Sequence, residues 1–196
     1  ATDTTGGYQR GNYATLNPLQ KSSEVTLSNG NLDVSTSSTS NKCKVFGTIG
    51  VSSGKWYYEV TIGSNYRGAF GWATDPNSNL AQQPGDSGGD IALTFDGDKI
   101  NSGSYQAGYG TAYSSGMVVG VRVDADTGEV GFSQNGIDKG IAYTVGPGKT
   151  YWPIVGDASS GGTFSGSVNF GQMRFKYGLP SGYAALNTTA LPAATI

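Results

Sequence analysis

The sequence predicts an all-β fold, an antiparallel two-sheet β-sandwich, and three observations support this prediction. Residues 116–136 (GMVVGVRVDADTGEVGFSQNG) alternate apolar side chains with small or polar ones between two turn-forming sequences. Glycine accounts for 32 of the 196 residues, more than twice its average usage, and apolar alternation persists between the glycine-rich turns. No window keeps apolar residues at helical spacing over three turns. A chain of this length suits one sandwich, which buries roughly 70% of its unfolded surface.

The most informative segment predicts an antiparallel meander. Valine occupies every second position of residues 119–123, the pattern of a strand with one buried face. Residues 126–128 (DTG) supply a turn, because glycine tolerates the positive φ that hairpin loops often need. The alternation resumes over residues 130–132, and residues 135–136 (NG) predict a second reversal.

The other elements follow in chain order. Residues 1–11 are polar and glycine-rich and are expected to form an arm or linker, and residues 12–175 form the sandwich. Within it, residues 12–19 are expected to pack along the sheets, and residues 24–34 and 91–100 to form hairpins. Further strands are expected over residues 43–49 and 55–62, and loops over residues 75–89, 102–115 and 157–166. Residues 176–196 are expected to be a tail without regular structure, because prolines and glycine interrupt it.

Five segments in order resemble the motifs of SPRY domains. They are residues 54–60 (GKWYYEV), 68–73 (GAFGWA), 116–136, 151–155 (YWPIV) and 168–171 (VNFG), and the resemblance covers roughly residues 48–171. The resemblance implies a concanavalin-like jelly roll that acts as a binding scaffold and carries its ligand pocket on loops at one end. A fold of this kind does not by itself identify the partner.

The flanking residues are similar to those around SPRY segments of tailed-phage virion proteins. Residues 17–19 (NPL) precede the first hairpin, and residues 185–188 (ALNT) lead to residues 191–192 (LP). Only 13% of residues are charged, about half the usual fraction, so the surface must be largely uncharged and polar. Surfaces of this kind are common on viral fibre and extracellular proteins. The expected function is therefore a recognition or structural module of a phage tail or head appendage, located in the virion or outside the cell. Its partners would be a host-surface glycan or protein and neighbouring virion proteins. The alternative is a cytoplasmic SPRY adaptor that binds a short peptide.

Composition argues against several other functions. Histidine is absent, which removes Ser-His-Asp and Cys-His catalysis and the commonest zinc ligand. A single cysteine, Cys43, excludes an intrachain disulfide. The net charge of −2 disfavours nucleic acid binding, and no apolar run approaches membrane-spanning length. We therefore expect no enzyme activity, cofactor or metal. A glycoside hydrolase using Glu59 stays a remote alternative, because it needs a second carboxylate nearby.

Two groups of residues are candidates for ligand binding. By position in the family, Tyr66 and Arg67 would line the end pocket, together with the loop at residues 75–89 and the segment at residues 157–160, which begins with Asp157. Arginine binds carboxylates through its planar fork, and tyrosine offers a flat amphipathic ring.

The second group is Tyr105, Tyr109 and Tyr113, which are spaced four apart among glycine and serine as in evolved binding loops. Their rings also suit a glycan. Alternatively, these three rings lie down on the sandwich and cover apolar surface. The three tryptophans, Trp56, Trp72 and Trp152, are assigned to the core.

Overall fold

The computed structural model describes residues 11–37, 42–158 and 162–192. Residues 1–10 of the expected arm, and residues 159–160 of the expected end pocket, lie outside them. The regular elements of the described residues are all strands. In chain order they are β1 (Leu16–Lys21), β2 (Val25–Ser28), β3 (Asp33–Thr36), β4 (Cys43–Gly47), β5 (Lys55–Tyr66), β6 (Gly68–Ala73), β7 (Asp90–Thr94), β8 (Lys99–Asn101), β9 (Ser104–Gln106), β10 (Val118–Asp124), β11 (Glu129–Gln134), β12 (Ile137–Thr144), β13 (Trp152–Asp157), β14 (Phe164–Asn169) and β15 (Ala184–Ala185).

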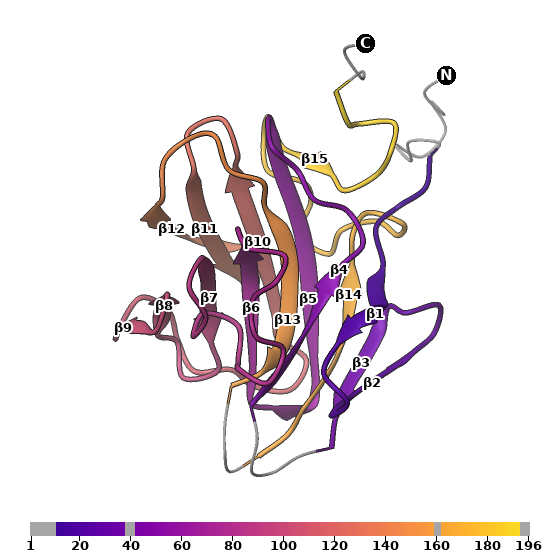
Figure 1. Cartoon of the computed structure of the whole chain (residues 1–196), viewed down its shortest axis with the longest axis vertical. Helices are drawn as coiled ribbons and strands as arrows, with labels where there is room; N and C mark the ends of the chain where they lie inside the picture. The colour runs from indigo at the N-terminus through magenta and orange to yellow at the C-terminus, as the bar shows by residue number, and fades with distance from the viewer. Residues whose placement is uncertain (1–10, 38–41, 159–161, 193–196) are drawn as a thin grey trace.

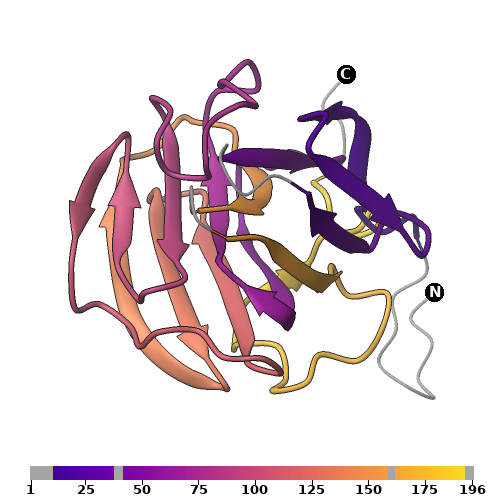
Figure 2. The same cartoon turned by 90° about the horizontal axis from the view of Figure 1, so that it is seen from below.

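The strands form two sheets, which confirms the predicted sandwich. One sheet, called here the first sheet, has the order β1-β4-β13-β6-β7-β8-β9. The second sheet has the order β12-β11-β10-β5-β14-β3-β2, and β15 pairs with β5 beside this path. Neighbouring strands in both sheets are antiparallel except β15, which runs parallel to β5. Figure 1 shows the long strands side by side, and Figure 2 shows the two sheets as packed layers.

The predicted meander is confirmed over β10, β11 and β12. Val121 pairs with Phe132 of β11, and the same valine pairs with Tyr58 of β5 on its other side. At the second turn, Asn135 (φ 48°) and Gly136 (φ 79°) both adopt the left-handed conformation that a tight hairpin needs. The apolar residues of the alternation are all fully buried. They are Val119, Val121, Val123, Val130 and Phe132.

The core between the sheets is rich in aromatic rings. Trp72 meets Tyr58 edge-on with ring centres 5.3 Å apart, and Phe70 packs against Phe164 at 5.0 Å. Trp56 is also buried, so the assignment of Trp56 and Trp72 to the core is confirmed. The assignment of Trp152 is wrong. Trp152 is only partly buried and packs with a small cluster that contains Ile154, separate from the main core.

Two short strands occur where the sequence predicted irregular structure. β9 lies inside the loop expected at residues 102–115, and its Tyr105 pairs with Ile100 of β8. β15 lies in the expected tail, where Ala184 pairs with Trp56. The prolines and glycines of the tail do not interrupt this stretch, because they lie outside residues 184–185. Leu186, which follows, is fully buried in the main core.

Candidate binding surfaces

Three of the predicted site residues meet at one end of the sandwich. Tyr66 ends β5, Arg67 links it to β6, and Asp157 ends β13, where it pairs with Gly68. The backbone N–H of Ala158 donates to the Arg67 carbonyl at 2.8 Å, which holds the two strand ends together. The structure therefore brings Tyr66, Arg67 and Asp157 into one neighbourhood, called here the strand-end surface.

The side chains of these residues differ in accessibility. Tyr66 is 44% exposed. The Arg67 guanidinium lies 5.1 Å from the centre of the Phe95 ring. A Cβ added to Gly162 would come within 2.1 Å of the Arg67 Cδ, so the Arg67 stem lies across this glycine. The Phe95 ring and the backbone at Gly162 thus hold the Arg67 side chain in place before a ligand binds.

Asp157 is not an exposed pocket residue. Its side chain is fully buried, and its Oδ2 accepts a hydrogen bond of 2.8 Å from the Thr36 hydroxyl on the opposite sheet. The Thr36 Oγ1 in turn accepts a hydrogen bond of 2.8 Å from the Phe164 N–H. Asp157 therefore satisfies buried polar groups between the sheets, because a buried hydroxyl and N–H need partners.

The loop at residues 75–89 covers the outer face of the first sheet. It begins after Ala73, at the end of β6 away from Arg67, and returns to β7. Beneath it, the Lys44 ammonium pairs with the Asp90 carboxylate and donates to the Ser87 hydroxyl at 2.9 Å. Burial lowers the pKa of Lys44 and raises the pKa of Asp90, because desolvation outweighs their mutual attraction. This loop is thus a structural cover with a buried ion pair.

The three predicted tyrosines do not form one exposed cluster. Tyr113 is buried, its ring stacks on Phe70 at 5.4 Å, and its hydroxyl donates to the Leu93 carbonyl at 3.0 Å. Tyr109 is half-buried and donates to the Gly140 carbonyl at 2.7 Å, and burial raises its pKa to about 12. The alternative that the rings lie down on the sandwich therefore describes these two.

Tyr105 is the exposed residue among the three predicted tyrosines. This residue of β9 is 47% exposed. Its hydroxyl donates to the Asp86 carboxylate at 3.2 Å and accepts from the Gln83 amide. These contacts tie Tyr105 to the loop at residues 75–89. Tyr105 thus belongs to the outer face of the first sheet, whereas Tyr66 and Arg67 belong to the strand ends.

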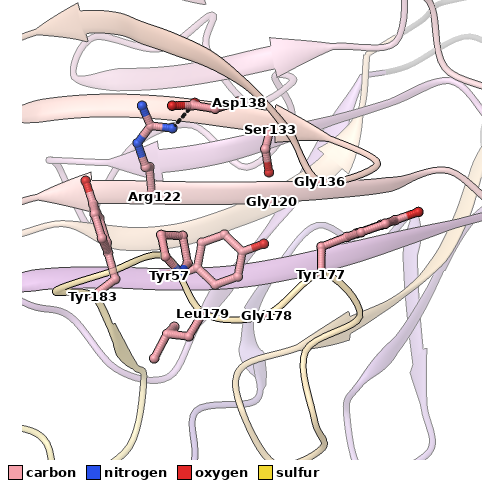
Figure 3. Close-up of a pocket in the computed structure, with 11 residues that line it drawn as sticks. Tyr57, Gly120, Arg122, Ser133, Gly136, Asp138, Tyr177, Gly178, Leu179 and Tyr183 are labelled. Carbon is pink, nitrogen blue, oxygen red and sulfur yellow. Dashed lines mark hydrogen bonds and ion pairs between the residues drawn. The ribbon is translucent and has the colours of Figure 1, made fainter.

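A groove of about 430 Å³ opens on the outer face of the second sheet. It lies between strands β5, β10, β11 and β12 on one side and the chain after β14 on the other, and we call it the outer groove (Figure 3). Figure 3 shows Arg122 reaching toward Asp138, with Tyr57 lying between Tyr183 and Tyr177. The lining residues are Tyr57, Gly120, Arg122, Ser133, Gly136, Asp138, Tyr177, Gly178, Leu179, Pro180 and Tyr183.

Glu59 holds the chain that forms one wall of this groove. Its Oε2 accepts a hydrogen bond of 2.8 Å from the Lys176 N–H, and its Oε1 accepts from the Tyr177 N–H at 3.3 Å and the Tyr57 hydroxyl at 3.1 Å. Phe175 adds an edge-to-face contact with Tyr57 at 5.0 Å. Both Glu59 oxygens are engaged by the protein and only 3% of the residue is exposed, so Glu59 serves as an anchor for the wall.

Sequence reasoning missed the outer groove. One clue was available, since Tyr57 and Arg122 alternate with the buried residues of their strands and therefore point to the outer face. Nothing in the local pattern of residues 174–183 indicated that they return to cover that face. The contact between Glu59 and Lys176 joins residues 117 positions apart.

Across residues 11–37, 42–158 and 162–192, no helix has the length and apolarity that crossing a membrane requires. Over the same ranges, histidine, cysteine, aspartate and glutamate side chains do not gather in threes that could hold a metal ion.

The curated proteins that are similar to this chain include the following two. The E3 ubiquitin-protein ligase RKP of Arabidopsis thaliana is 33% identical over 129 residues, which are 63% of this chain and 10% of that protein. The ATP-dependent RNA helicase Ddx1 of Drosophila melanogaster is 30% identical over 140 residues, 69% of this chain and 18% of that protein. The chain thus spans less than a fifth of either relative.

A solved structure and a family profile agree on the fold. The crystal structure of the SPRY domain of human HERC1 superposes with a TM-score of 0.65 at 17% identity, covering 81% of this chain and 99% of that one. The profile described as SPRY domain matches residues 55–173, from the start of β5 to just past β14. The relatives described above are eukaryotic proteins and give no link to phages. On this match, over more than half of its length, the chain belongs to the SPRY domain family of protein-interaction modules.

Proposed function

We propose that the chain is a non-catalytic protein-interaction domain that binds a short peptide segment of its partner at the strand-end surface. The single observation that carries this proposal is that two suitable residues follow one another at one end of a SPRY sandwich. Tyr66 is exposed, and the guanidinium of Arg67 is held against the Phe95 ring. Interaction surfaces of proteins are rich in tyrosine and arginine.

The geometry suits recognition of a peptide carbonyl or carboxylate. Arg67 rests on Phe95 and on Gly162, so its guanidinium loses little freedom when a ligand binds. A guanidinium donates two parallel hydrogen bonds to a carboxylate. Tyr66 adds a flat apolar face for a neighbouring side chain.

We further propose a cytoplasmic setting in which this domain supplies recognition to a larger activity. The curated relatives are named as a ubiquitin-protein ligase and an RNA helicase, and the chain matches 10% and 18% of their lengths. Such a share supports an accessory role beside another domain. The engagement of both Glu59 oxygens with the protein argues against the glycosidase alternative.

A binding test on the strand-end surface checks this proposal. Peptides selected from a random display library on the wild-type chain would be measured against Arg67→Ala and Tyr66→Ala, with Tyr105→Ala as the control. Tyr105 is similarly exposed but lies on β9. We expect each strand-end variant to lose about tenfold in affinity, the effect of about 1.4 kcal/mol, and the control to bind as the wild type. Unchanged affinity in both strand-end variants would reject the surface.

A virion module is the second candidate, and the low charged fraction of 13% favours it. In that case the chain would bind a host-surface glycan. The residue to test is Tyr105, because it is the exposed one among the three tyrosines predicted to bind a ligand. Glycan-array binding that is lost in Tyr105→Ala and retained in Arg67→Ala would favour this candidate over peptide recognition. Detection of the chain in purified phage particles would support it independently.

A further inference from the structure

We propose that the outer groove is a second binding site, for an acidic peptide segment that carries apolar side chains. This inference goes beyond the strand-end surface, because the outer groove is formed by a different face of the sandwich and by different residues. Four features of the groove support it, namely its shape, its charge, an exchangeable ion pair and an exposed apolar rim.

Glycines make the groove deep enough to hold a ligand. A Cβ added to Gly120 would come within 2.3 Å of the Ser133 hydroxyl and 2.4 Å of the Tyr57 hydroxyl, so only glycine lets these groups close over β10. A Cβ on Gly136 would lie 2.7 Å from Tyr177, which packs on the turn between β11 and β12. The resulting volume, about 430 Å³, falls in the range of ligand pockets.

Taken together, the groove and the hollow beside it are lined by more cations than anions. The adjoining hollow shares Tyr177 with the groove and is lined by Arg174 and Lys176. With Arg122, these residues place three cations around the two depressions, against the single carboxylate of Asp138. The whole chain has a net charge of −2, so this face departs from the charge of the molecule. The Glu59 carboxylate lies beneath, engaged with backbone N–H groups. An acidic partner is therefore favoured electrostatically.

The ion pair in the groove is arranged for exchange. Arg122 is held on the sheet, with its guanidinium against Gly131 and its side chain 15% exposed, whereas the Asp138 side chain is 62% exposed. The ion pair is thus open to water on the Asp138 side, and an ion pair that water can reach contributes little to stability. A ligand carboxylate can thus replace Asp138 on the Arg122 fork while Asp138 turns to water.

Exposed apolar side chains border the same face. Tyr177 and Leu179 line the groove and are 47% and 43% exposed, and Ile137, next to Gly136, is 65% exposed. Exposed apolar groups that gather beside a groove are typical of protein contact sites. Apolar groups beside cations match a peptide that combines carboxylates with apolar residues, better than a neutral sugar or a nucleic acid.

The test uses peptides of one apolar sequence whose polar positions are all glutamate, all glutamine or all lysine. Each is titrated into the ¹⁵N-labelled chain, and amide shifts locate the binding site. The groove variants are Leu179→Glu, which adds a repelling charge at an exposed position, and Arg122→Gln. The matched control is Leu19→Glu, because Leu19 is 94% exposed on β1.

We expect the glutamate peptide to bind best and to shift the amides of β10, β11 and residues 176–183. Each groove variant should weaken binding about tenfold, while Leu19→Glu and Arg67→Ala leave it unchanged. Because Arg67→Ala tests the strand-end surface separately, failure of one site does not decide the other. Equal binding of the three peptides, no binding of any, shifts confined to the strand ends, or preference for a neutral oligosaccharide or a single-stranded oligonucleotide would overturn the proposal.

Discussion

Cys43 begins β4 as a fully buried side chain. Burial raises the pKa of its thiol from 9.0 to about 11. A thiol reagent acts on the thiolate, so the native chain at pH 8 should react only as fast as it opens. We expect modification to be slow in buffer and complete in denaturant. Rapid labelling of the native chain would contradict the burial.

The same cysteine contributes to the pH dependence of stability. A group whose pKa is raised by folding favours the folded state while it stays protonated. Its contribution is therefore full below about pH 9 and is lost as the pH rises toward about 11. We expect the free energy of unfolding of the wild type to fall over this interval more steeply than that of Cys43→Ala. Urea denaturation at several pH values measures the difference.

At the level of elements, residues 174–177 are attached to β5 through the Glu59 carboxylate. In Glu59→Gln, the charge is lost and an amide NH₂ replaces one oxygen that accepts from the backbone. We expect the variant to be less stable by about 1–3 kcal/mol, the usual effect of losing hydrogen bonds to a buried charge. Amide hydrogen exchange should accelerate at Lys176 and Tyr177. Unchanged exchange at these two amides would show that other contacts hold the segment.

For the whole molecule, the ion pair between Lys44 and Asp90 joins β4 to β7 under the loop at residues 75–89. Removing one partner leaves a buried charge without compensation, so Lys44→Met should cost about 3–5 kcal/mol. The double variant with Asp90→Leu should recover most of this loss, because it removes both charges. Denaturant midpoints of the wild type, single and double variants decide this. A double variant as unstable as the single one would show that packing, and not charge, matters there.

The predictions from sequence succeeded where a local pattern decides the structure. The alternation around Val121 and the Asn135–Gly136 turn identified strands, faces and a reversal correctly. They failed where a distant segment decides burial. Asp157 is buried because Thr36 of the opposite sheet meets it, and Trp152 faces outward with Ile154. Thr36 lies 121 positions from Asp157, so no local pattern reports that contact. A period of two residues places Trp152 and Ile154 on the same face of β13 but does not tell which face of the strand meets the main core.

The sequence by itself determined the all-β sandwich, its main turns, the valine-rich core and a likeness to SPRY domains, because side-chain alternation and turn chemistry are local properties. Only the tertiary structure decided which outer faces are covered and where grooves remain. The outer groove depends on Glu59 holding Lys176 across 117 positions, and Tyr113 is buried because its ring stacks on Phe70. Such contacts form only when the whole chain packs, because the free energy gained by burying a segment depends on both of the surfaces that come into contact.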